Sequence, residues 1–427
     1  MIIESGINKS EYYIELENRY GAKNYKPLPV VIERGEGVFL WDVEGKKYFD
    51  FLSAYSAVNQ GHCHPSITKA LIDQAQTLAL TSRAFYNDCL GEYEKYVTDL
   101  FGYDKVLPMN TGAEAVETAI KLCRKWAYEK KGIEENKALI VVCEGNFHGR
   151  TTTIISFSSD PDSNKNFGPY APGFLSIPYD DISALENALK LPNVVGFLVE
   201  PIQGEAGVYT PSDDYISKAR NLCTENGVLF IADEVQTGIG RTGSLLAVCG
   251  NCNCEQKCER QKNTYSRPDI LILGKALSGG VYPVSAILAD DEIMLVIKPG
   301  QHGSTFGGNP IAAKVAIAAL EAVNAENLIQ NARKLGAVFR NEMNRIIATS
   351  DLVLKVRGKG LLNALVINDS ETGKTAWNLC LALKENGLLA KPTHGNIIRF
   401  APPLIITKEQ ITECIEIIEK TINSFKK

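Results

Sequence analysis

The sequence lacks any apolar run long enough to cross a membrane, which argues against an integral membrane protein. It also lacks an excess of basic residues: its formal net charge is −5 at pH 7, which argues against nucleic-acid binding as the main role. The first residues, MIIESGINKSEYYIELENRYG, contain neither an apolar signal core nor the arginine-rich, acid-poor pattern of a mitochondrial presequence. We therefore expect a cytoplasmic protein.

The cysteine content limits the protein class further. Eleven cysteines are scattered over 427 residues, a pattern typical of a reducing compartment rather than of a disulfide framework. Four of them, Cys249, Cys252, Cys254 and Cys258, gather in a polar stretch at about 249–266. Their spacing is compatible with a metal knuckle or a redox switch. Because no histidine lies nearby and the spacing fits no zinc module, we expect an inserted surface loop of reduced thiols and no metal site.

The order of apolar runs predicts an α/β fold. From about residue 61 to 322, short apolar runs that are typical of buried strands alternate with helical patterns. The runs are Ala138–Cys143, Phe197–Val199, Val228–Ala232, Ile270–Leu273 and Val284–Ala289. This alternation predicts a large domain with a mainly parallel sheet and helices on both faces. A helix over about Pro310–Val323 leads out of it.

Two smaller regions flank this large domain. Residues 1–60 are rich in aromatic and turn residues and predict an arm with a small β meander, which packs with a smaller α/β domain at 323–427. The latter contains the apolar run Leu361–Ile367. Its last helix begins at Thr407 with Gln410 three residues on, the pattern of a capping box. The apolar face of that helix comprises Ile411, Cys414, Ile415, Ile418, Ile422 and Phe425.

Two charged residues end two of the predicted strands. Asp233 follows the run Val228–Ala232, and Lys275 follows the run Ile270–Leu273. Because an open α/β sheet presents its ligands at the carboxyl ends of its strands, we expect both residues at one edge of the sheet. A buried lysine with a lowered pKa forms Schiff bases with carbonyls. For either residue alone, a purely structural interpretation is the better one: Asp233 as a helix cap and Lys275 as a solvated loop residue.

A third feature predicts an anion site. Thr111 is followed by Glu114, a second capping box, and then by apolar residues at helical spacing. The amides of Gly112 and Ala113 then lie at a helix N-terminus, where backbone N–H groups bind phosphate. By itself the pattern marks only a well-capped helix.

These segments together resemble a known family. The stretches LFIADEVQTGIGRTG, LGKALSGGVYPVSA and GQHGSTFGGNP are similar to those of the class-III aminotransferases, which are fold-type I enzymes dependent on pyridoxal 5′-phosphate. The resemblance extends from NYKPLPVVIERGEGVFLWDVEGKKYFDF to KPTHGNIIRFAPPL, nearly the whole chain. It implies that Lys275 binds the cofactor aldehyde and that Asp233 keeps the pyridine nitrogen protonated, so that the ring accepts electrons.

The resemblance also implies the remaining cofactor contacts. The phosphate binds Gly112 and Ala113, and the second subunit of a homodimer contributes Ser304 and Thr305 to the same group. The residues expected around the ring are Phe147 and Val235 on its two faces, Gln236 at its 3-oxygen, and His148 in the pocket wall. Glu200 is expected to support the site without touching the substrate.

Substrate recognition is implied in the same way. Arg150 and Arg399 are the arginines expected to bind carboxylates, because a guanidinium pairs with a carboxylate through two parallel hydrogen bonds. Glu205 is expected to cover Arg399 in one half-reaction and to leave it in the other. Tyr25 and Tyr55 are expected to shape the amino-donor side of the pocket.

Within the family, the resemblance is greatest to enzymes that act on ornithine. It implies transfer of the δ-amino group of L-ornithine to 2-oxoglutarate, giving L-glutamate and L-glutamate 5-semialdehyde, which cyclises to pyrroline-5-carboxylate. Alternatives are an ω-aminotransferase for acetylornithine, 4-aminobutyrate or lysine, and a binding protein that has kept this fold without catalysis. A dinucleotide-dependent dehydrogenase is disfavoured, because no predicted strand precedes a complete Gly-x-Gly-x-x-Gly pattern.

Overall fold

The computed structural model describes residues 8–249 and 266–425, and its centre is a seven-stranded mixed sheet. The strand order is β4-β10-β9-β8-β7-β5-β6, in which only β10 runs antiparallel to its neighbours. The strands are β4 (Lys105–Met109), β5 (Leu139–Cys143), β6 (Phe174–Ile177), β7 (Val194–Val199), β8 (Leu229–Asp233), β9 (Ile270–Leu273) and β10 (Ser285–Ala289). The predicted fold class is confirmed.

Five of these strands coincide with the predicted apolar runs, whereas β4 and β6 escaped prediction. Both of them lie at the edges of the sheet, and each contains polar or half-exposed positions. The inner strands β7, β8, β9 and β10 are buried at every position. A strand that is buried on both faces gives a continuous apolar run, so the pattern identifies inner strands better than edge strands.

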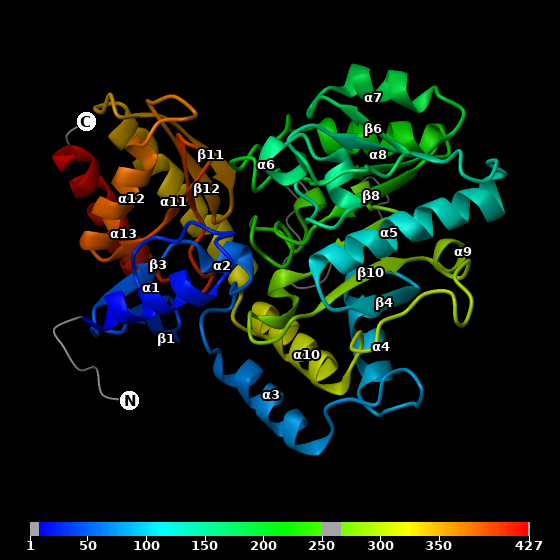
Figure 1. Ribbon diagram of the computed structural model, residues 1–427, viewed down its shortest axis with the longest axis horizontal. Helices are drawn as coiled ribbons and strands as arrows, with labels where there is room; N and C mark the ends of the chain where they lie inside the picture. The colour runs from blue at the N-terminus through cyan, green and yellow to red at the C-terminus, as the bar shows by residue number, and fades with distance from the viewer. Residues whose placement is uncertain (1–7, 250–265, 426–427) are drawn as a thin grey trace.

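Helices cover both faces of this sheet (Figure 1). On one face, α5 (Gly112–Trp126) packs on a layer that includes Ile231, Ile272 and Ile287. The alternate side chains of the same strands join a second, larger core, to which α10 (Pro310–Ala325) contributes. The other helices of this part are α3 (Pro65–Thr77), α4 (Leu90–Phe101), α6 (Pro161–Asn164), α7 (Ile182–Leu189), α8 (Tyr215–Glu225) and α9 (Asp291–Met294).

The C-terminal part forms a second layered unit, seen on the left of Figure 1. Its antiparallel sheet has the order β11-β12-β15-β14, formed by Val353–Lys359, Leu362–Ile367, Ile397–Phe400 and Lys391–Thr393. Its helices are α11 (Leu328–Ile347), α12 (Thr375–Glu385) and α13 (Lys408–Ser424). The capping box of Thr407 and Gln410 at the start of α13 is present as predicted. Phe425 lies just beyond the end of that helix.

The N-terminal segment joins this second unit. After α1 (Lys9–Tyr20), the strands β1 (Ile32–Glu36), β2 (Phe39–Asp42) and β3 (Lys47–Asp50) form an antiparallel meander, and β3 pairs in parallel with β13 (Leu388–Leu389). Figure 1 shows these blue strands beside the C-terminal helices. The division of the chain at residues 60/61 and 322/323 stays a prediction. The second of these boundaries falls inside α10.

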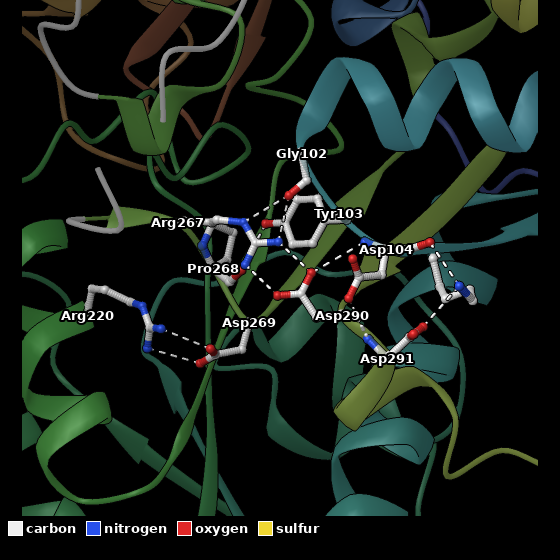
Figure 2. A network of polar contacts seen from close by, with 10 residues as sticks. Gly102, Tyr103, Asp104, Arg220, Arg267, Pro268, Asp269, Asp290 and Asp291 are labelled. Atoms are coloured by element: carbon white, nitrogen blue, oxygen red, sulfur yellow. Dashed lines mark hydrogen bonds and ion pairs between the residues drawn. The ribbon is translucent and has the colours of Figure 1, made fainter. Parts of the chain in front are cut away.

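A network of polar contacts fixes the beginning of β9 (Figure 2). The guanidinium of Arg267 lies over the ring of Tyr103, donates to the carbonyl of Gly102 at 2.7 Å, and chelates the carboxylate of Asp290 at 2.6 and 2.9 Å. Asp269 accepts two hydrogen bonds from Arg220, at 2.9 and 3.0 Å. Two arginine–carboxylate pairs therefore fix the residues that directly precede β9.

The predicted cysteine cluster lies mostly outside the described residues. Cys252, Cys254 and Cys258 belong to 250–265, whereas Cys249 is buried at the end of a short 3₁₀ helix, Ala247–Cys249. Within residues 8–249 and 266–425, no group of three or more histidine, cysteine or acidic side chains is arranged to hold a metal ion. None of the helices in that same part has the length and apolar composition required to cross a membrane.

Candidate active site

The structure brings Asp233 and Lys275 to the same edge of the large sheet, as the strand pattern predicts. Strands β8 and β9 are parallel neighbours, with Asp233 opposite Ile272. Lys275 begins a short 3₁₀ helix, Lys275–Ser278, and has a φ of 46°, in the left-handed region that side chains disfavour. Burial lowers the pKa of the Lys275 ammonium, because removal of water disfavours the charged form.

A cavity of about 190 Å³ surrounds the Lys275 side chain. Its lining comprises Gly112, Ala113, Phe147, His148, Gly149, Glu200, Asp233, Val235, Gln236, Thr237 and Lys275. Sequence reasoning named all of these except Gly149 and Thr237. Each of the two lies directly beside a named residue, within FHGR and VQTG, so adjacency to those motifs is the signal that was available.

One end of the cavity is the N-terminus of α5. The Thr111 Oγ1 accepts a hydrogen bond from the Glu114 amide at 3.2 Å, and the Glu114 Oε2 accepts one from the Thr111 amide at 3.1 Å, so the predicted capping box is present. The amides of Gly112 and Ala113 belong to the first turn and have no carbonyl partner within the helix. A Cβ on Gly112 would lie 3.0 Å from Val235, which explains the glycine. This end fits an anion.

Two further residues of the cavity lining, His148 and Asp233, are hydrogen-bonded to each other. The His148 Nδ1 lies 2.7 Å from the Asp233 Oδ2, and both side chains are buried. Burial opposes the imidazolium, but the hydrogen bond and charge of Asp233 outweigh it, so the pKa of His148 lies above its ordinary value. The His148 Nε2 is buried and makes no hydrogen bond to the described residues. His148 therefore holds one oxygen of the Asp233 carboxylate in place.

Glu200 is a further titratable group of the cavity lining. Its Oε1 accepts a hydrogen bond from the Phe147 amide at 2.7 Å, and its Oε2 accepts one from the Gly204 amide at 3.4 Å. The pKa of Glu200 is raised to about 7: burial is the largest cause, and the Asp233 carboxylate adds to the rise, whereas His148 and the two amide hydrogen bonds oppose it. The carboxyl group of Glu200 thus links the segments that carry Phe147 and Glu205.

Arg399 and Glu205 form the predicted pair. The Arg399 Nη1 lies 2.8 Å from the Glu205 Oε1, and the Arg399 side chain is almost fully buried. Gln236 joins them: its Nε2 donates to Glu205 at 3.0 Å, and its Oε1 accepts from Arg399 at 3.2 Å. Burial favours the neutral acid, but the charge of Arg399 outweighs it and lowers the pKa of Glu205. Both the nitrogen and the oxygen of the Gln236 side chain therefore have hydrogen-bond partners in this arrangement.

Tyr55 lies against the same arginine. The Arg399 guanidinium carbon is 4.8 Å from the centre of the Tyr55 ring, a cation–π distance. Tyr55 belongs to α2 (Ser53–Ser56), four consecutive residues with φ between 46° and 70°. A left-handed turn of non-glycine residues is strained, and Asp50 supports it by accepting the amides of Leu52 and Ser53 at 2.8 and 2.9 Å. The strained turn places the Tyr55 ring against the Arg399 guanidinium.

Seven predicted site residues lie outside the cavity lining. Three of them, Tyr55, Glu205 and Arg399, form the contacts described above, and the other four are Tyr25, Arg150, Ser304 and Thr305. Arg150 is exposed, with its guanidinium carbon 5.7 Å from the centre of the Phe147 ring. Tyr25 is 67% exposed, and Thr305 is also exposed. Ser304 accepts a hydrogen bond from the Asn110 side chain at 2.7 Å. Their roles stay predictions.

The residues present fit pyridoxal 5′-phosphate. The cavity is lined by the amides at the start of α5, by the partly buried Lys275, whose pKa burial lowers, and by the buried carboxylate of Asp233. These groups match a phosphate, an aldehyde and a pyridine nitrogen respectively. The buried His148 Nε2 has no hydrogen-bond partner among the described residues, so this part of the cavity can accept a further polar group.

Comparison with known proteins agrees with this fit. A mitochondrial ornithine aminotransferase from Drosophila ananassae is 62% identical over 97% of this chain and 92% of its own length. The structure of an acetylornithine aminotransferase from Elizabethkingia anophelis is 61% identical, with a TM-score of 0.87, over 98% of this chain and 100% of that one. The ornithine aminotransferase of Toxoplasma gondii, described with partial occupancy of PLP, is 46% identical, with a TM-score of 0.92, over 97% and 94%.

These relatives overturn one expectation. The relative from Drosophila ananassae and several others of similar identity are named mitochondrial, so the prediction of a cytoplasmic protein is wrong. The prediction relied on the composition of about twenty N-terminal residues. The compartment is set by a targeting signal that import receptors recognise, and the folded protein does not require that signal.

The match to a family covers most of the chain. Residues 20–422 match the family described as aminotransferase class-III, and this range includes every residue of the cavity lining. On these grounds of sequence, fold and site geometry, the chain belongs to the class-III aminotransferases.

Proposed function

We propose that this protein transfers the δ-amino group of L-ornithine to 2-oxoglutarate, giving L-glutamate 5-semialdehyde and L-glutamate, with pyridoxal 5′-phosphate as its cofactor. Relatives of 54–62% identity over nearly the whole chain are named ornithine aminotransferases, which supports the substrate. The observation that carries the chemistry is Lys275, which lines the cavity with a pKa lowered by burial, at the end of the strand next to the one that ends with the buried Asp233.

The side chains around the cavity have separate roles in the reaction. When bound, pyridoxal phosphate supplies an aldehyde and a protonated ring that delocalises negative charge from the substrate carbon. The Lys275 Nζ would accept a proton from the substrate carbon and donate it again, which is the task of an amine with a lowered pKa. Asp233 keeps a proton at the ring nitrogen, and His148 fixes the Asp233 carboxylate by its 2.7 Å contact.

The residues that would hold the cofactor all line the cavity. The amides of Gly112 and Ala113 would bind its phosphate, Phe147 and Val235 would pack against its ring, and Gln236 would donate a hydrogen bond to the 3-oxygen of the ring. These contacts would exclude water from the reacting carbon, which strengthens the interactions of Lys275 and Asp233.

Glu205 decides which substrate carboxylate reaches Arg399. With Glu205 on Arg399, as here at 2.8 Å, ornithine binds its α-carboxylate to Arg150 and its α-amino end to Tyr25, and so presents its δ-amine. When Glu205 moves away, Arg399 binds the α-carboxylate of 2-oxoglutarate. Tyr55, 4.8 Å from the guanidinium, keeps the arginine in position through both half-reactions.

The working unit is a homodimer with shared sites. Thr305 is exposed and lies outside the cavity lining of its own chain, which supports a role for Ser304 and Thr305 at the phosphate of a second copy. We expect light scattering to give twice the chain mass of 46.8 kDa. Thr305→Ala should weaken cofactor binding without changing that mass. A monomer with full activity would contradict the dimer.

A second candidate substrate is N-acetylornithine. The Elizabethkingia anophelis structure, 61% identical over its full length, carries that substrate in its name. Acetylation removes the α-ammonium charge of ornithine and adds bulk at the end that Tyr25 contacts. The two substrates therefore differ at the end that we assign to Tyr25, a residue that is 67% exposed.

The test has two parts. Borohydride should abolish a visible absorption band of the purified protein and fix the cofactor covalently to the chain, and Lys275→Ala should prevent this attachment because no amine then binds the aldehyde. A panel of L-ornithine, N-acetylornithine, 4-aminobutyrate and lysine, with 2-oxoglutarate as acceptor, should give the highest kcat/KM for ornithine. A higher kcat/KM for N-acetylornithine would mean that N-acetylornithine, and not ornithine, is the amino donor. The absence of any visible band would contradict the proposal of a pyridoxal phosphate-dependent aminotransferase.

A further inference from the structure

A second cation lies beside the Glu205–Arg399 pair. In the antiparallel pairing of β14 with β15, Lys391 stands directly opposite Arg399. Directly opposed residues of an antiparallel pair project to the same face of the sheet, with their Cβ atoms about 4.5–5.5 Å apart. Like charges in that position repel each other. The placement of two opposed cations on this face therefore calls for an anion between them.

Glu205 is the anion that both cations face. It pairs with Arg399, and its charge also acts on Lys391: burial lowers the pKa of Lys391, the Glu205 carboxylate opposes this shift, and Arg399 adds to it. The same strand holds the backbone of the Glu205 segment, because the Thr393 Oγ1 donates to the Glu205 carbonyl at 2.6 Å. The base of the Glu205 side chain is thus fixed against β14, two residues from Lys391.

The proposed exchange at Arg399 creates an electrostatic problem. When a substrate carboxylate takes Arg399, Glu205 loses a partner in a largely buried place. A buried carboxylate without a partner is strongly destabilising, and this cost would count against the binding of 2-oxoglutarate. The Gln236 amide offers one hydrogen bond, at 3.0 Å in the present arrangement, but no charge.

We propose that Lys391 receives the Glu205 carboxylate when a substrate carboxylate displaces it from Arg399. The fixed backbone contact at Thr393 keeps Glu205 beside β14, so rotation of its side chain is sufficient to exchange one cation for the other. Lys391 is then a positioning residue that acts through Glu205, and its effect is confined to the half-reaction that uses Arg399. This inference rests on the proposed exchange at Arg399, although not on the identity of the amino donor.

The test measures the two half-reactions of the holoenzyme separately, by the absorbance of the cofactor. The first uses whichever donor of the panel the parent protein converts fastest, and the second uses 2-oxoglutarate. Lys391→Met removes the charge and keeps the length of the side chain. We expect it to raise the 2-oxoglutarate concentration for half-maximal rate about ten-fold and to change the donor half-reaction less than about two-fold, because only the former leaves Glu205 unpaired.

Two matched variants make the result specific. Lys391→Arg keeps a cation and should restore most of the 2-oxoglutarate half-reaction. Lys355→Met removes an exposed lysine from β11 of the same sheet and should change neither half-reaction. Glu205→Ala removes the carboxylate with which Lys391 would pair. In that background, Lys391→Met should therefore not change the 2-oxoglutarate half-reaction any further.

Three outcomes would overturn the inference. An equal effect of Lys391→Met on both half-reactions would mean that the lysine serves only the fold of the pocket. An undiminished effect in the Glu205→Ala background would mean that Lys391 binds the substrate carboxylate itself. No effect at all would mean that Glu205 has another partner. Failure of the parent protein to convert ornithine would instead contradict the proposed donor, and is seen in the first half-reaction alone.

Discussion

The His148 Nδ1 lies 2.7 Å from the Asp233 Oδ2, although 85 residues separate the two in the sequence. Both side chains are buried, and the other oxygen of Asp233 accepts the Val235 amide at 3.0 Å. The carboxylate is therefore fixed by one hydrogen bond to each oxygen. A fixed carboxylate can keep a proton on a ring nitrogen without reorganising during the reaction, which is how preorganised charges lower a barrier.

His148→Phe should reduce the rate of the donor half-reaction. The substitution keeps a planar ring but removes the donor to Asp233, and a lost buried hydrogen bond of about 1–3 kcal/mol corresponds to about a ten- to hundred-fold decrease in kcat. Single-turnover absorbance measurements on the holoenzyme would show it. His148→Gln, which keeps a donor, should lose less. Equal losses in both variants would mean that packing, and not the hydrogen bond, is what His148 provides.

Glu205→Ala should change the choice of amino group. Without Glu205 on Arg399, the guanidinium is free for the α-carboxylate of an amino donor, which then presents its α-amine. We expect the ratio of kcat/KM for glutamate over ornithine to rise by at least about ten-fold, which is about 1.4 kcal/mol of differential stabilisation. Glu205→Gln keeps a hydrogen bond to Arg399, so its ratio of kcat/KM should lie between those of the parent protein and Glu205→Ala. An unchanged ratio would remove Glu205 from substrate selection.

Glu200→Gln should alter the pH dependence of stability. Burial raises the pKa of Glu200 from 4.5 to about 7, so its contribution to the stability of the folded cofactor-free protein is fully present below pH 4.5 and is lost as the pH rises through about 7. The loss amounts to roughly 3 kcal/mol at most. Glutamine does not titrate, so the variant should gain stability relative to the parent between pH 5 and 8.

Urea unfolding at several pH values would measure this difference. The exposed Glu225→Gln is the control and should show no such gain. A difference between Glu200→Gln and the parent that stays constant from pH 5 to 8 would show that Glu200 does not titrate in this range.

Asp290→Asn should weaken the network in Figure 2. Asparagine has one acceptor oxygen and no charge, so Arg267 would lose its chelating carboxylate, and the Asp104 amide, which is now 3.4 Å from the Asp290 Oδ1, would share the single remaining oxygen with it. Because Asp290 is partly exposed, we expect the free energy of unfolding to fall by about 1–2 kcal/mol. Asp291→Asn, next to it, breaks only the exposed ion pair with Lys105 and should cost about 0.5 kcal/mol or less. Equal Tm decreases for the two variants would contradict this ranking.

The local patterns in the sequence determined most of the central fold. The inner strands appear as apolar runs because both of their faces are buried, and the starts of α5 and α13 follow from Thr111 and Thr407, each paired with a residue three positions on. Edge strands such as β4 expose part of their side chains, so their runs are mixed and were missed. The placement of Lys275 beside Asp233 also followed, since parallel strands bring their carboxyl ends to one edge.

The tertiary structure alone decided which side chains meet. The bond between His148 and Asp233, the three-way contact of Arg399, Glu205 and Gln236, and the position of Lys391 opposite Arg399 all depend on strand register and on packing between distant segments. A shift of one residue in the pairing of β14 with β15 would turn Lys391 to the other face without changing the sequence pattern. Local sequence specifies caps and buried strands because those interactions span a few residues, whereas the charge balance of the site arises only where separate segments pack together.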